Sequence, residues 1–61
     1  MEDLKAKLEK LLLEADDCDI IGNLAADENK RNFFRKLASQ LRAMAHDIEA
    51  MIALRTRREG N

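Results

Sequence analysis

The stretch Ala25-Ala26-Asp27 decides the fold, because it separates two long apolar patterns with helical spacing. Before this break, apolar or small residues follow one another at alternating steps of four and three, which keeps them on one side of an α-helix. They are Leu4, Leu8, Leu11, Ala15, Cys18, Gly22 and Ala25. The spacing excludes a β-strand and predicts a helix over residues 3–25.

After the break, two apolar lines merge into one broad face. One line is Leu37, Leu41, Met44, Ile48 and Met51, and the other is Phe34, Ala38, Leu41, Ala45, Ile48 and Ile52. A helix with so wide an apolar face can contact two neighbours at once. We therefore predict a second helix over residues 28–57 that has more than one packing partner.

Asp27 provides the chemistry that starts the second helix, since the chain contains no proline. As an N-cap residue, its carboxylate can accept a hydrogen bond from the backbone N–H of Asn29 or Lys30. Asp27 and Glu28 also place negative charge at the positive end of the helix dipole. Residues 1–61 are therefore predicted to form one all-α domain, an antiparallel two-helix hairpin.

Setting Ala25 opposite Lys30 pairs small residues of the first helix with large residues of the second, which favours close packing. The predicted pairs are Gly22 with Phe33 or Phe34, Cys18 with Leu37, Ala15 with Leu41, Leu11 with Met44, Leu8 with Ile48 and Leu4 with Met51. Charge favours the same arrangement, because residues 1–29 carry a net charge of −6 and residues 30–61 a net charge of +5.

A hairpin of 61 residues leaves part of its apolar surface uncovered. Leu13, Ile20 and Leu24 form a further apolar strip on the first helix, away from its main line. Surplus apolar surface marks interfaces, and twofold dimers are the commonest oligomers. We therefore predict a homodimer that forms a four-helix bundle, with another protein as a second candidate partner. The predicted interface residues are Leu13, Ile20, Leu24, Phe34, Leu37, Leu41, Ile48 and Ile52.

Composition and charge argue against several functional classes. A net charge of −1 is not typical of a nucleic-acid coat protein. The longest apolar run, Ala50 to Leu54, is far shorter than the roughly 20 residues of a membrane span. Glu2 and Asp3 do not fit the basic start of a secretory signal, and a single cysteine is typical of a reducing compartment. We expect a cytoplasmic protein with no membrane span.

No residue pattern indicates an enzyme, a cofactor or a metal site. Cys18 lies in the apolar line of the first helix and is interpreted as a small buried residue. His46 lies on the polar side of the second helix without another histidine or a cysteine three or four residues away, so it is interpreted as solvated. A di-iron bundle would need a glutamate three residues before the histidine, and this chain has Ala43 there.

The acidic run Asp16-Asp17-Cys18-Asp19 lacks the spacing and the glycine of a calcium loop. Its carboxylates are predicted to face the basic start of the second helix. The basic residues concerned are Lys30, Arg31 and Arg35.

Two functions remain after these exclusions. The first is a protein-interaction or structural module whose dimer exposes apolar residues to a partner. The alternative is a small nucleic-acid-associated regulator in which Arg55, Arg57 and Arg58 contact phosphates. These arginines also suit the end of a helix dipole, and no aromatic residues are interleaved with them. The interaction module is therefore favoured.

Residues Ala15 to Leu54 resemble short uncharacterised bacterial proteins that form helical hairpins. The shared pattern is Ala-x-Asp-x-x-Lys-Arg-x-x-Phe-x-x-Leu-Ala, from Ala25 through Ala38. Glu28 stands where such sequences often carry proline. The resemblance implies a dimeric hairpin and no particular substrate.

Overall fold

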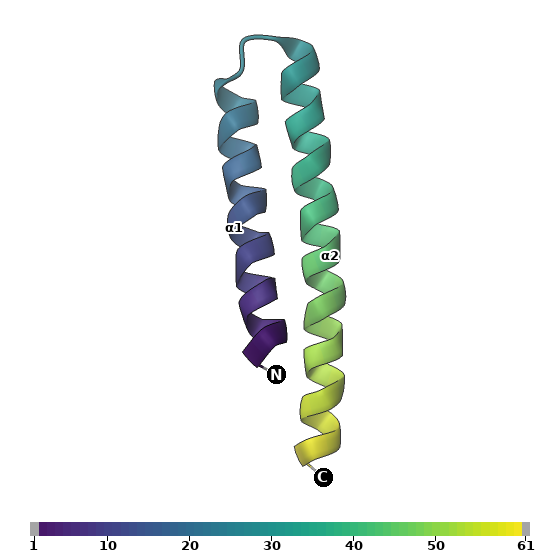
Figure 1. Cartoon of the computed structure of the whole chain (residues 1–61). Coiled ribbons are helices and arrows are strands. Elements are labelled where there is room, and N and C mark those ends of the chain that lie inside the picture. The colour runs from purple at the N-terminus through teal and green to yellow at the C-terminus, as the bar shows by residue number, and fades with distance from the viewer. Residues whose placement is uncertain (1, 61) are drawn as a thin grey trace.

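A computed structural model describes residues 2–60, and the surroundings of the side chains as far as Arg58. Helices α1 (Glu2–Leu24) and α2 (Glu28–Gly60) run antiparallel and are joined by a short loop (Figure 1). The predicted all-α hairpin is confirmed, and α2 continues three residues past the predicted end at residue 57. Since α1 has 23 residues and α2 has 33, the C-terminal end of α2 extends beyond the start of α1.

The loop residue Asp27 caps α2 as predicted. The backbone N–H of Asn29 donates a hydrogen bond to Oδ1 of Asp27 over 2.9 Å. The N–H of Arg31 donates to the carbonyl of Asp27 over 3.0 Å and forms the first helical turn. Because these amides would otherwise lack partners at the helix start, Asp27 determines where α2 begins.

A basic side chain of α2 binds the C-terminal end of α1. The last turn of α1 contains no basic residue. A guanidinium N–H of Arg31 instead donates to the carbonyl oxygen of Ala25 over 3.2 Å, where the negative end of the α1 dipole favours positive charge. The prediction that Arg31 faces the acidic run of α1 was therefore wrong, because this side chain turns back to the loop.

The two helices pack through a narrow seam of small and medium-sized residues. Its buried members are Leu11, Ala15 and Cys18 of α1 and Ala38, Leu41 and Ala45 of α2. Partly buried Leu8, Phe34, Leu37 and Ile48 pack against them. The backbones come close near the loop, since a Cβ atom added to Gly22 would lie 3.4 Å from Cβ of Phe34. The predicted contact between Gly22 and Phe34 is confirmed.

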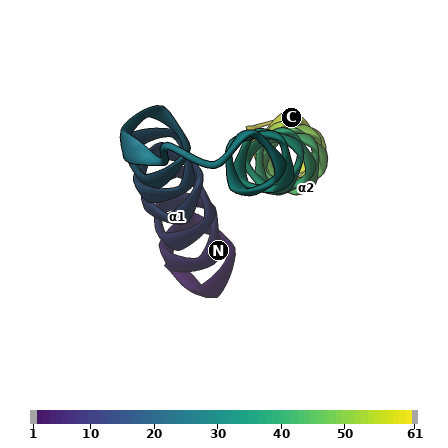
Figure 2. The same cartoon turned by 90° about the horizontal axis from the view of Figure 1, so that it is seen from above.

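Met44 and Met51, which were predicted to pack on Leu11 and Leu4, are not buried in the seam. The exposed fractions of Met44 and Met51 are 48% and 49%, whereas Ala45 is fully buried. Close packing favours the alanine line of α2, because a small side chain lets the helix axes approach each other. The methionines are thereby placed beside the seam. Viewed from the loop end, α1 also leans across the direction of α2 instead of running parallel to it (Figure 2).

Candidate interaction surface

One flank of the hairpin carries a row of exposed apolar side chains on α2. Each of them immediately precedes a residue of the apolar line of α2 that packs on α1, so all four are displaced from the seam in the same direction. This seam line consists of Phe34, Ala38, Leu41, Ala45, Ile48 and Ile52. We call the row of exposed side chains the α2 stripe, and it consists of Phe33, Leu37, Met44 and Met51. Leu37 is half-buried, and the other three side chains are about half exposed or more.

The ring of Phe33 contacts one other aromatic ring, although its exposed fraction is 62%. It packs edge-to-face on the ring of Phe34, with a centroid distance of 5.3 Å and an interplanar angle of 85°. Such contacts between aromatic rings are favourable beyond the area they bury. The loop end of the α2 stripe therefore presents an aromatic surface to solvent.

Open hollows lie at the two ends of the α2 stripe. The loop-end hollow has a volume of about 600 Å³ and is lined by Ile21, Leu24, Ala25, Ala26, Asp27, Lys30 and Phe34. The tail hollow has a volume of about 180 Å³ and is lined by Met51, Leu54, Arg55 and Arg58. Both hollows are shallow and mainly apolar, so they suit side chains of a partner better than an enclosed substrate.

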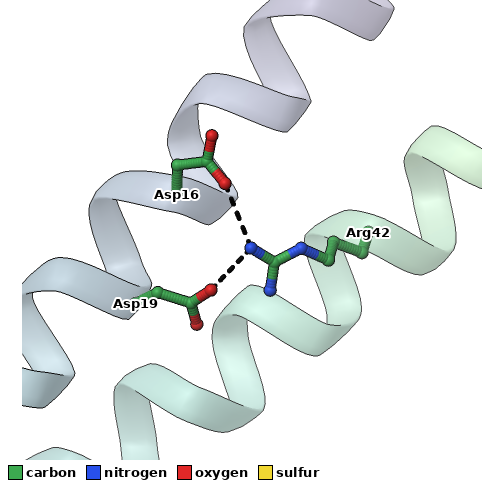
Figure 3. A network of polar contacts seen from close by, with 3 residues as sticks. All are labelled: Asp16, Asp19 and Arg42. Atoms are coloured by element: carbon green, nitrogen blue, oxygen red, sulfur yellow. Dashed lines mark hydrogen bonds and ion pairs between the residues drawn. The ribbon is translucent and has the colours of Figure 1, made fainter.

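The opposite flank is polar, because Arg42 immediately follows the buried Leu41. Its guanidinium binds the carboxylates of Asp16 over 3.1 Å and of Asp19 over 2.5 Å (Figure 3). The hydrogen bond with Asp19 is the main reason that the pKa of Arg42 lies above its ordinary value, and it keeps this side chain charged. The ion pairs hold the two helices together across the polar flank (Figure 3).

The carboxylates of Asp16 and Asp19 were predicted to face Lys30, Arg31 and Arg35 at the basic start of α2, but both form ion pairs with Arg42 instead. With Gly22 opposite Phe34, these aspartates lie more than a turn further from the loop than Lys30 does. Arg42 is the basic side chain that reaches them.

The remaining predicted interface residues divide into three groups. Leu13, Ile20 and Leu24 are exposed on the outer face of α1, as expected, with exposed fractions of 65%, 56% and 81%. Half-buried positions along the seam are occupied by Phe34, Leu37, Ile48 and Ile52. Leu41 is buried against α1, with an exposed fraction of 8%, so it belongs to the hairpin core and its assignment to an intermolecular interface is corrected.

The interface residues predicted from the sequence did not include Phe33, Met44 and Met51 of the α2 stripe. The signal was present, since each of them directly precedes a residue of the seam line. It could be interpreted only after the structure had shown which of the two apolar lines of α2 packs on α1.

The residues with reactive or charged groups are placed as follows. Cys18 is buried in the seam and His46 is exposed, as predicted for both. Arg55, Arg57 and Arg58 are exposed near the free end of α2. Within residues 2–60, no three histidine, cysteine or carboxylate side chains come together as a metal site would require.

Neither α1 nor α2, as far as the structure describes them, combines the length and the apolar composition that a bilayer-spanning helix needs.

The faces of the hairpin differ in chemical character. The α2 stripe with its two hollows covers one flank, Arg42 and its carboxylates occupy the other, and the apolar strip of α1 lies on the outer face. Comparisons with protein-family models, with curated proteins and with solved structures found no match to this chain.

Proposed function

We propose that this chain is a small protein-interaction module that acts as a homodimeric helical bundle. One observation carries the proposal. Nine large apolar side chains of the described residues have exposed fractions of 40% or more, while the buried core contains only two leucines among smaller residues. A core of this size stabilises a 61-residue chain weakly, and exposed apolar rows of this length mark interfaces.

The α2 stripe is the surface that we assign to self-association. Its apolar residues recur along α2 beside the seam, with the polar Gln40 and Asp47 between them, so a second hairpin packed on it would extend the existing core. The expected product is a bundle of four helices. Burial of Met44 and its neighbours in this bundle would supply apolar contacts that the single hairpin lacks.

Sedimentation equilibrium at micromolar concentration tests the proposal. The expected mass is twice the 7.0 kDa of the chain. Met44→Glu should give a monomer, because it places a charge in the interface. His46→Glu is the matched control, since His46 is an exposed residue of the same helix outside the α2 stripe. A well-folded wild-type monomer at every concentration tested would refute self-association.

The outer face of α1 is the surface that we assign to another protein. Leu13, Ile20 and Leu24 are apolar and exposed there, and the acidic Asp16 and Asp17 lie beside them. This combination fits an amphipathic helix that has basic residues next to its apolar row. A pull-down with the wild type and with Ile20→Glu should retrieve such a partner with the wild type alone. Retrieval of the same partner by both proteins would contradict the assignment.

A further inference from the structure

We infer that the two hairpins of the dimer pack antiparallel along their α2 helices, with Met44 on the twofold axis. The inference rests on the proposed homodimer and adds its orientation. It follows from the symmetry of the α2 stripe, from the position of the two hollows and from the charges at the two ends of α2.

The α2 stripe has the same spacing in both directions from its centre. Met44 is the middle residue of α2, with 16 residues on each side within Glu28–Gly60. Leu37 and Met51 lie seven residues before and after it. In an antiparallel pair centred on Met44, Leu37 of one copy therefore packs on Met51 of the other, at both ends of the contact.

Phe33 and Arg55, which lie further from Met44, are also brought opposite each other in the antiparallel pair. Phe33 lies eleven residues before Met44, and Arg55 lies eleven residues after it. The antiparallel pair brings the guanidinium of Arg55 to the exposed ring of Phe33 in the other copy. A guanidinium over an aromatic ring is a favourable contact. Each dimer contains this contact twice.

The two hollows lie on the flank of the hairpin that the antiparallel dimer would cover. Ile21 of the loop-end hollow precedes the buried Gly22 just as Met44 precedes the buried Ala45. In an antiparallel pair of helices, the residues that come one position before a seam residue lie on the same side of the pair in both helices. The loop-end hollow therefore opens on the flank that carries the α2 stripe. The tail hollow contains Met51, a member of the stripe itself. The antiparallel dimer places the tail of each copy, with Leu54, beside the loop-end hollow of the other.

The charges favour this orientation over the parallel one. A parallel dimer would gather six guanidinium groups at one end, from Arg55, Arg57 and Arg58 of both copies. The antiparallel dimer separates the two sets by about 33 to 42 Å along the axis, since Arg55 lies eleven and Arg58 fourteen residues from Met44. The loop end of the other copy, where each set then lies, carries Asp27 and Glu28 but also Lys30, Arg31, Arg35 and Lys36, so the gain from the antiparallel orientation is the separation of the two arginine sets. The dipoles of the two α2 helices also oppose each other.

Disulfide cross-linking between single-cysteine variants tests the orientation. Cys18→Ala removes the native thiol and serves as the background. Leu37→Cys and Met51→Cys are then oxidised separately and as a mixture. In the antiparallel dimer, position 51 of one copy lies about 21 Å along the axis from position 51 of the other, too far for a disulfide. Only the mixture should give a covalent dimer, at a yield several-fold above that of either variant alone.

Met44→Cys is the internal control, because it lies on the axis and should cross-link with itself. Efficient cross-linking of Met51→Cys alone would show a parallel dimer and overturn the inference. A dimer by sedimentation that cross-links neither in the mixture nor through Met44→Cys would overturn it too, by placing the interface elsewhere. A folded monomer by sedimentation in the Cys18→Ala background and in the wild type would refute the proposed homodimer itself.

Discussion

Replacement of Leu41 by alanine tests whether the seam is the core of the hairpin. Leu41 has an exposed fraction of 8% and packs in the buried cluster between α1 and α2. Removal of a buried leucine side chain costs about 2 to 5 kcal/mol. We expect about 3 kcal/mol, because the seam is thin and its alanine neighbours leave the helices room to move together. A chain of 61 residues has a free energy of unfolding of roughly 3 to 9 kcal/mol, so this single change removes a large part of it.

Urea denaturation followed by circular dichroism at several protein concentrations measures the effect. Leu13→Ala is the matched control, since its side chain is 65% exposed and its loss should change the free energy of unfolding by no more than about 0.5 kcal/mol. Because Leu41 packs within one chain, its loss should lower the free energy of unfolding even at concentrations where the dimer dissociates. Equal effects of Leu41→Ala and Leu13→Ala would mean that the helices pack through another face.

Three further changes test the cap, the close approach and the arginine cluster. Asp27→Ala should destabilise the protein by about 1 kcal/mol, and Asp27→Asn should retain most of the stability, since the cap needs a side-chain oxygen; equal loss in both would contradict the N-cap. Gly22→Ala should stabilise by up to about 1 kcal/mol through helix propensity, whereas Gly22→Val should destabilise through contact with α2; thermal melts that rank valine above alanine would disprove the close approach. DNA and RNA titrations at near-physiological salt should show no submicromolar binding, and binding that disappears when the clustered arginines become glutamine would favour the regulator function. These arginines are Arg55, Arg57 and Arg58.

The fold could be predicted because its determinants are local in the sequence. The steps of four and three residues indicate helices, and Asp27 caps the second helix through the amide of Asn29 as expected. The contact of Gly22 with Phe34 followed from matching small residues to large ones. Each of these features depends on residues whose order along the chain nearly fixes their positions in space.

The sequence could not predict which apolar line of α2 packs on α1, because this depends on the rotation of each helix about its own axis. Two apolar lines on α2 were both compatible with the sequence, and only packing selects the line that contains Ala45. That rotation exposes Met44 and moves Arg42 to the opposite flank, within reach of Asp16 and Asp19. The same rotation creates the candidate surface, so the candidate surface could not be defined before the seam.

The distribution of side-chain size in this chain connects its stability with its assembly. Alanine at positions 15, 38 and 45 brings the helices close together, while larger side chains such as Phe33 and Met44 remain outside the seam. The intramolecular contact is therefore narrow, and much of the apolar area that could stabilise the fold can be buried only against a second chain. Since a partner that binds only the folded state raises its stability by mass action, we expect the midpoint of unfolding to rise with protein concentration. Met44→Glu should remove this dependence while the helices still form at low temperature, because Met44 contributes to the dimer and not to the seam. A wild-type midpoint that stays constant over a hundredfold dilution across the micromolar range would show that the narrow seam is sufficient by itself.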